Sequence, residues 1–162
     1  FARKIKLANM GMLKTALAAL LSFVFLMAGG NKVTDQIHAP THAELSAGFK
    51  DQFGPMWANI INNDLKVPSD AAVYKMLIDD GSKTYAVMRT IIGFTEIACV
   101  VMLWSPLRDL ASFVLLGIMI PACYTHHVGN DGKMAVPAVL AALIVLLLLP
   151  ESKPAAGKKK TK

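Results

Sequence analysis

The chain has 162 residues, the length of one domain, and 54% of them are hydrophobic whereas 17% are charged. This balance excludes an ordinary soluble domain and indicates a protein of the lipid bilayer. The formal net charge is +6, and basic residues gather at both ends of the chain. Such basic ends indicate orientation in a membrane and contact with anionic lipids rather than nucleic-acid binding.

The chain begins at Phe1 instead of methionine. We therefore expect either a processed precursor with an organelle import history or a sequence that lacks its first residues. The first apolar stretch is not expected to be a signal peptide, because no small-residue cleavage site bounds it and it is nearly long enough to span a membrane.

Four stretches are apolar enough to cross a hydrocarbon core ~30 Å thick, which requires ~20 helical residues. They lie at about residues 12–30, 85–104, 109–126 and 134–150. The last two need flanking polar residues to reach full length. Because the runs lack the alternation of barrel strands, we predict an all-α fold, a four-helix transmembrane bundle with a long, partly helical first connection.

This membrane domain is expected to occupy residues 1–150, and residues 151–162 form a basic tail. Four spans place both termini on one side of the membrane. The termini are basic and the first connection, residues 31–84, carries more acidic than basic residues. The positive-inside tendency therefore predicts termini on the stroma or matrix side of an organelle inner membrane, either thylakoid or mitochondrial.

The first connection is longer than helix connections in bundles usually are, so we expect it to carry structure of its own. Thr41 followed by Glu44 matches a capping box and predicts a short helix from about His42 to Phe53. A second short helix is predicted from Ser69 to Asp79.

Aromatic side chains in this connection are numerous for a loop in water. We expect them to contact other membrane protein subunits, pigments or lipids, and the alternative is that the connection folds back over its own bundle. Lysines of the tail are expected to contact partners as well. The predicted partner contacts are Phe49, Phe53, Trp57, Tyr74, Lys158, Lys159 and Lys160.

Charged residues inside spans are costly, so Arg89 and Glu96 require an explanation. They lie seven residues apart, on the same helix face, with Gly93 between them where a helix, lipid or ligand could approach closely. We expect Glu96 to be protonated or to pair with Arg89, Lys32 or a histidine.

The four-span topology brings further polar groups to this end of the bundle, which predicts an intramembrane polar cluster. Its members are Lys32, Arg89, Glu96, His126 and His127. Three interpretations remain open: the cluster locks the helix register, it lines a ligand or headgroup pocket, or it has a proton or redox role.

The sequence does not predict an intrinsic cofactor, a metal site or a catalytic site. His126 and His127 could ligate a metal or a tetrapyrrole, but adjacent helical residues point 100° apart, and a helix-end histidine bonded to a loop is the commoner arrangement. Cys99 and Cys123 are expected to pack as small apolar side chains. Bound lipids are expected, and pigment or quinone could occupy interfaces.

Three blocks resemble the DoxX-like membrane family: Phe25–Lys32, Arg89–Glu96 and His126–Asp131. A relative of that family, the animal acetylcholine-receptor chaperone, is similar over the same blocks and the fourth span. The resemblance covers about residues 15–149 and implies a four-helix bundle. It aligns the polar positions of the family with Lys32, Arg89, Glu96 and His126, whereas the long first connection departs from the pattern.

The resemblance implies little about activity, because fold does not fix function. Our main hypothesis is a non-catalytic accessory subunit of a large photosynthetic or respiratory membrane complex, supported by the basic tail, the missing initiator and the lack of a complete catalytic set. The alternatives are a quinone-linked redox subunit, suggested by Arg89, Glu96 and the family's association with a quinol oxidase, and a membrane chaperone or assembly factor.

Overall fold

The computed structural model describes residues 2–64, 66–68, 70–72, 75 and 81–150, and these residues form helices and loops without any strand. The prediction of an all-α fold is confirmed for this part of the chain. Most of the second predicted loop helix, Ser69–Asp79, lies outside the described residues. So do Tyr74 and the tail lysines Lys158, Lys159 and Lys160.

Three helices are long and apolar enough to cross a membrane: α1 (Ala2–Val33), α5 (Gly81–Leu103) and α6 (Arg108–Gly129). They match the first three predicted spans, although α1 continues past the predicted end of its span. The fourth, α7 (Ala135–Leu148), has 14 residues, fewer than the ~20 that a full crossing requires. A bundle of four spanning helices is therefore not confirmed.

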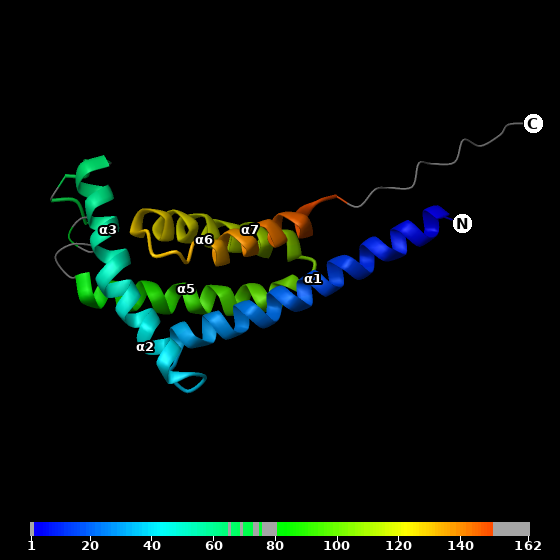
Figure 1. Cartoon of the computed structure of the whole chain (residues 1–162), viewed down its shortest axis with the longest axis horizontal. Coiled ribbons are helices and arrows are strands. Elements are labelled where there is room, and N and C mark those ends of the chain that lie inside the picture. The colour runs from blue at the N-terminus through cyan, green and yellow to red at the C-terminus, as the bar shows by residue number, and fades with distance from the viewer. Residues whose placement is uncertain (1, 65, 69, 73–74, 76–80, 151–162) are drawn as a thin grey trace, which may run out of the picture.

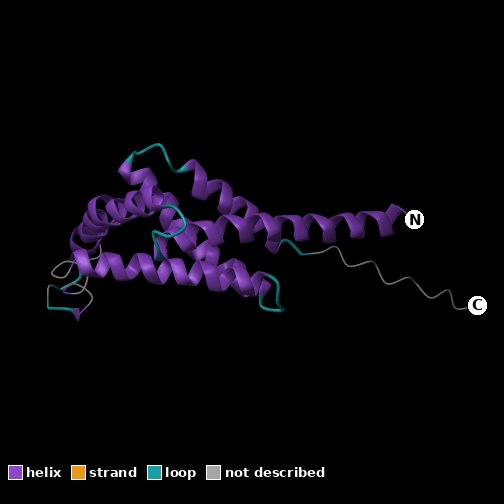
Figure 2. Ribbon diagram, turned by 90° about the horizontal axis from the view of Figure 1, so that it is seen from below, coloured by secondary structure: helices purple, strands orange, loops and turns teal. Residues whose placement is uncertain are grey.

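The long helices are arranged in two pairs (Figure 1). Helix α1 lies along α5, and α6 lies along α7, with α5 and α6 joined by a short turn at residues 104–107. The start of α1 and the end of α7 lie at the same end of the molecule. The first connection runs across the opposite end, as the view from below also shows (Figure 2).

We call residues 39–64 of the first connection the arm. The arm is a continuous series of short helices: α2 (Ala39–Gly48), the π-helical turn η1 (Phe49–Phe53), α3 (Gly54–Asn59) and the second π-helical turn η2 (Ile60–Asp64). The predicted helix His42–Phe53 therefore exists, but helical structure extends beyond it in both directions.

The predicted capping box at Thr41 and Glu44 is wrong. Helix α2 begins three residues earlier than expected, with His38 as its N-cap and Pro40 in its first turn. The Nδ1 atom of His38 accepts a hydrogen bond from the Thr41 amide at 3.3 Å. Proline at the first helical turn needs no amide partner, so Pro40 and His38 together start the helix before Thr41 can cap it.

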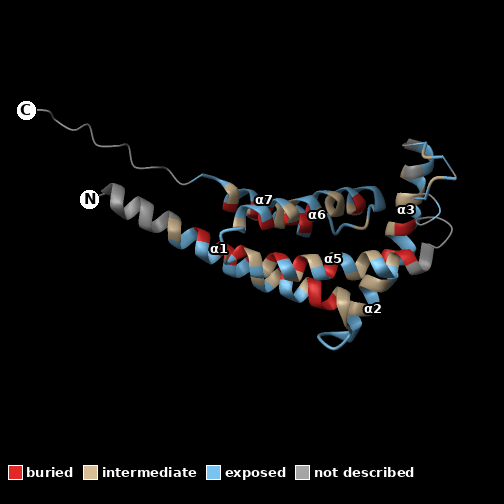
Figure 3. Cartoon of the chain, turned by 180° about the vertical axis from the view of Figure 1, so that it is seen from behind, coloured by how far each residue is buried: buried red, intermediate tan, exposed pale blue. Residues whose placement is uncertain are grey.

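The apolar core lies toward the end of the bundle away from the arm (Figure 3). Among the described residues, its six least exposed apolar side chains are at most 1% exposed: Leu21, Phe25, Ala111, Leu115, Ile144 and Leu147. They come from α1, α6 and α7, so α7 is an integral part of the core although it is short. Lys14, in the first half of α1, donates a hydrogen bond from Nζ to the carbonyl of Leu149, the C-cap of α7, at 2.6 Å.

The outward faces of the long helices carry large apolar side chains. Phe23, Phe94 and Phe113 are 67%, 57% and 62% exposed, and they come from α1, α5 and α6. Exposed apolar surface of this extent is covered by lipid or by another protein.

Candidate functional site

The site begins where α1 crosses α5. A Cβ atom at Gly29 would lie 2.7 Å from the Gly93 carbonyl oxygen, and a Cβ atom at Gly93 would lie 2.7 Å from the Gly29 carbonyl oxygen. Only glycine on both helices permits backbones to approach this closely. The crossing lies one helical turn before Lys32 on α1 and one turn before Glu96 on α5.

Lys32 and Glu96 form an ion pair at this crossing. The Lys32 Nζ atom donates to both carboxylate oxygens of Glu96, at 2.9 and 2.8 Å. Helical side chains lean toward the N-terminus of their own helix, so on these two helices both side chains lean back toward the glycine crossing. The Glu96 side chain is 1% exposed and that of Lys32 is 13% exposed, so the pair is largely buried.

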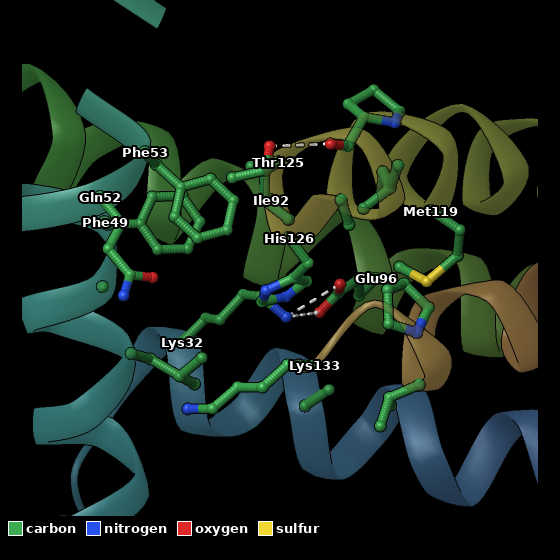
Figure 4. A pocket seen from close by; sticks show the side chains of 18 of the residues that line it. Lys32, Phe49, Gln52, Phe53, Ile92, Glu96, Met119, Thr125, His126 and Lys133 are labelled. Atoms are coloured by element: carbon green, nitrogen blue, oxygen red, sulfur yellow. Dashed lines mark hydrogen bonds and ion pairs between the residues drawn. The ribbon is translucent and has the colours of Figure 1, made fainter. Parts of the chain in front are cut away.

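A chamber of about 590 Å³ opens beside this ion pair (Figure 4). Its walls are mainly apolar and come from the arm and from all four bundle helices. Aromatic side chains of the arm, Phe49, Phe53 and Trp57, line it together with Met119 and Leu140 of the bundle. A volume of ~300–1,000 Å³ is typical of pockets that hold a small organic ligand.

The turn between α6 and α7 supplies the second polar group of the chamber. Asn130 and Gly132 both have positive φ angles, 47° and 73°, and this sharp turn carries Asp131 back toward α6. There the Oδ2 atom of Asp131 lies 2.6 Å from Nδ1 of His126. The His126 ring also packs edge-on against the Phe53 ring, with centroids 6.0 Å apart.

The environment of Asp131 determines which nitrogen of His126 carries a proton. The backbone N–H of Lys133 donates to Oδ1 of Asp131, and this hydrogen bond and the one with His126 lower the pKa of the carboxyl below its usual value. An ionised carboxylate only accepts hydrogen bonds, so Nδ1 of His126 must be the donor. In the neutral ring, Nε2 is then an acceptor.

A second ion pair joins the arm to this turn. Lys133 donates from Nζ to Oε1 of Glu44 at 2.5 Å, and both side chains are more than half exposed. The hydrogen bond and the nearby charge lower the pKa of Glu44 and raise that of Lys133. Both residues line the mouth side of the chamber, so the pair holds the arm over it.

Arg89 attaches the arm to α5 rather than pairing with Glu96. Its Nη1 atom lies 3.2 Å from Nε2 of His42 and bonds Oγ of Ser46, both on α2. The other ring nitrogen of His42, Nδ1, lies 2.8 Å from the Asn31 carbonyl oxygen. A carbonyl can only accept, so Nδ1 carries the proton and Nε2 accepts from Arg89.

The described aromatic residues that were predicted to contact partners, Phe49, Phe53 and Trp57, lie against the chain itself. Phe49 is 7% exposed and stacks on Phe53, with ring centroids 4.7 Å apart and planes 8° apart. Trp57 is half-buried at the chamber wall. The arm therefore folds back over its own bundle, the alternative that the sequence left open, and contact with other chains stays a prediction.

The structure brings together three of the five predicted cluster residues. Lys32, Glu96 and His126 line one chamber, whereas Arg89 bonds the arm and His127 is exposed. Sequence reasoning missed Asp131, Glu44 and Lys133. The sequence did contain a signal for the crossing of α1 and α5, because a glycine lies three residues before Lys32 on α1 and three residues before Glu96 on α5. Cys99 and Cys123 are free thiols, and Cys99 is buried as expected.

Comparison with known proteins adds one finding. A model of the DoxX-like family matches residues 83–147, a stretch that contains most of α5, all of α6 and most of α7. It includes Glu96 and His126 but not Lys32 or the arm. No curated protein and no solved structure matches the chain, so the similarity to the acetylcholine-receptor chaperone is not confirmed. The three apolar helices and the family match both fit an integral membrane protein.

Proposed function

We propose that this chain is a non-catalytic integral-membrane protein that binds one small amphipathic molecule in the chamber between its bundle and its arm. The observation that carries the proposal is the chamber itself, about 590 Å³ in volume and mainly apolar, with the Lys32–Glu96 ion pair at one side. Sites for small molecules commonly combine an apolar cavity with a few convergent polar groups.

The arrangement of the walls supports a ligand with an apolar body and a polar head. Phe49 and Phe53 of the arm face Met119 and Leu140 of the bundle, and a hydrocarbon body would pack between such surfaces. Lys32, Glu96 and His126 offer hydrogen bonds to a head group placed among them (Figure 4). The arm covers one side of the chamber and would shield that side of the bound molecule from the surrounding medium.

In this proposal α7 makes a fourth crossing of the membrane, with both termini on the stroma or matrix side of an organelle inner membrane. Support comes from the packing of α7 in the core and from the shared end at which α1 starts and α7 ends. At ~1.5 Å per residue, α7 is about 21 Å long, so flanking residues or local thinning of the bilayer would complete the crossing.

Filling the chamber tests the proposal. Ala122 lines the chamber on α6, whereas Ala98 is exposed on the outer face of α5, so the same change to phenylalanine can be made at both. Native mass spectrometry of the full chain, released from lipid nanodiscs, should show one bound small molecule in the wild type and in Ala98→Phe. Ala122→Phe should lose it. Equal ligand content in all three proteins would contradict the proposal.

An accessory subunit of a photosynthetic or respiratory complex is the second candidate, and it is compatible with ligand binding. Its support is the exposed apolar surface of three helices, including Phe23, Phe94 and Phe113. Purification of the native complex followed by mass spectrometry would reveal stable partner subunits. A quinone-linked redox subunit would instead show quinone-dependent electron transfer, and a chaperone would show partners only during assembly.

A further inference from the structure

The ionisable residues of the chamber wall are arranged in pairs. The lysines are Lys32 and Lys133, and the acids are Glu44, Glu96 and Asp131. Each lysine donates to one of these acids, Lys32 to Glu96 and Lys133 to Glu44. Among the residues that the structure describes, the chamber wall therefore has no surplus of positive charge with which to attract an anionic head group.

An anionic head group would have to take Lys32 from Glu96. That would leave a carboxylate whose side chain is 1% exposed without its cation, which is strongly unfavourable. A cationic head group is disfavoured too, because it would lose its hydration in a mainly apolar chamber. The two oxygens of Asp131 already accept from the Lys133 amide and the His126 ring. A neutral head group requires none of these pairs to break.

Two polar atoms near the buried ion pair, one on Lys32 and one on His126, match a neutral group that both accepts and donates a hydrogen bond. A lysine has three N–H donors, and in the described residues the hydrogen bonds of Lys32 go to the two oxygens of Glu96, so one N–H can donate to a ligand. In the neutral His126 ring Nε2 is an acceptor, because Nδ1 donates to Asp131. A hydroxyl group accepts from the first and donates to the second, whereas an ether or a ketone can only accept.

We propose, on the basis of the ligand-binding function above, that the chamber selects a neutral amphiphile with a free hydroxyl group, a lipid alcohol. The hydroxyl donates to Nε2 of His126 and accepts from Nζ of Lys32, and the apolar body packs against the aromatic residues of the arm and against Met119 and Leu140. Asp131 acts through His126 as a positioning residue, because it fixes the tautomer that leaves Nε2 free to accept.

Binding competition in nanodiscs containing the full chain tests this selection. The reporter is a photoreactive long-chain alcohol, and the competitors are hexadecanol, a sterol and a monoacylglycerol, each paired with a derivative in which every free hydroxyl group is converted to a methyl ether. Hexadecanoic acid and hexadecylamine complete the set. At least one alcohol should compete about tenfold better than its own ether, since that is the effect of about one hydrogen bond. The alcohol that exceeds its own ether by the largest factor identifies the apolar body that fits the chamber.

Adjacent histidines provide matched variants. His126→Phe keeps a ring of similar shape but removes the acceptor, so the alcohol should compete no better than the ether. His127→Phe changes an exposed residue outside the chamber, so the preference for the alcohol should persist. If His126→Phe does not fold, the alcohol-to-ether ratio of the wild type still tests whether the chamber prefers a free hydroxyl group.

The outcomes separate the two proposals. Acid or amine binding as tightly as the alcohol, or alcohols and ethers binding equally, overturns the selection of a lipid alcohol while leaving the ligand-binding function in place. If no reporter labelling of the wild type can be displaced by any competitor, the selection of a lipid alcohol fails. The ligand-binding function itself fails only if native mass spectrometry also finds equal ligand content in the wild type and Ala122→Phe. A tenfold preference that is lost in His126→Phe and kept in His127→Phe supports both.

Discussion

Gly29 and Gly93 meet backbone to backbone, and each occupies the space that a Cβ atom on the other helix would need. This contact brings α1 and α5 close enough for Lys32 to reach Glu96 across the crossing. The glycine contact therefore determines the geometry of the ion pair, and the ion pair determines the polar side of the chamber.

Alanine substitutions at glycines should have opposite effects according to their position. Gly29→Ala and Gly93→Ala each place a Cβ atom 2.7 Å from a backbone oxygen, so each should destabilise the protein by ~1–3 kcal/mol. Gly11 lies in the same helix as Gly29, and a Cβ atom there would meet nothing within 4 Å. Gly11→Ala should stabilise by ~0.5–1 kcal/mol through helix propensity. Thermal unfolding in detergent micelles measures the three effects, and destabilisation by Gly11→Ala equal to that of the others would be inconsistent with a close crossing.

The buried ion pair should show strong coupling between its partners. Lys32→Met leaves Glu96 without its cation and should destabilise by ~3–5 kcal/mol, whereas the double variant with Glu96→Leu should recover much of that loss, because no charge is left unpaired. Lys133→Met removes an exposed lysine and should change the unfolding temperature little. A double variant as unstable as the sum of its single changes would show that the two residues do not interact.

The attachment of the arm to the α6–α7 turn should be lost in acid. The pKa values of Glu44 and Asp131 are both lowered in the folded protein, so their contributions are present above their ordinary values near ~4 and disappear as the pH falls through the lower, folded values. Amide hydrogen exchange of α2 should therefore be faster at pH 3 than at pH 6, after correction for intrinsic rates. Glu44→Gln should already show the faster exchange at pH 6. If exchange in Glu44→Gln accelerates between pH 6 and pH 3 as much as it does in the wild type, the acceleration comes from groups other than Glu44.

Arg89 should stabilise the arm without affecting the ion pair. Arg89→Met removes the donor to His42 and Ser46, so exchange in α2 should accelerate while the unfolding temperature of the bundle changes little. Arg108→Met, at the opposite end of the bundle, is the matched control and should leave exchange in α2 as in the wild type. Unchanged exchange in Arg89→Met would mean that the arm is held by other contacts.

The sequence allowed the long helices to be predicted because uninterrupted apolar runs depend on local composition alone. Three of four predicted spans were long enough, whereas α7 was limited to 14 residues by the turn before it and Pro150 after it. The partner of Glu96 was left open among Arg89, Lys32 and a histidine. The partner depends on which helix faces cross. In the sequence, this crossing is indicated by the equal spacing of Gly29 from Lys32 and of Gly93 from Glu96.

The arm was harder to predict than the bundle. Its capping residue was assigned to Thr41 because the capping-box pattern ignores a preceding His38 and Pro40, which start the helix earlier. The partnership of His126 with Asp131 depends on a turn with two positive φ angles, at Asn130 and Gly132, which composition does not specify. The chamber arises from the packing of the arm against the four bundle helices and has no signature in a single segment.

The most direct measurement of the central claim is the position of photolabelling in the full chain. A photoreactive long-chain alcohol should label chamber residues such as Met119 and Leu140 at saturable sites, and an excess of the alcohol that competes best should protect them. Phe113 and Ile120, which lie exposed on the outer face of α6, should be labelled without saturation, as bilayer lipid contacts. Labelling confined to outward-facing residues, or labelling of Met119 and Leu140 that no competitor reduces, would contradict a chamber that binds a lipid alcohol.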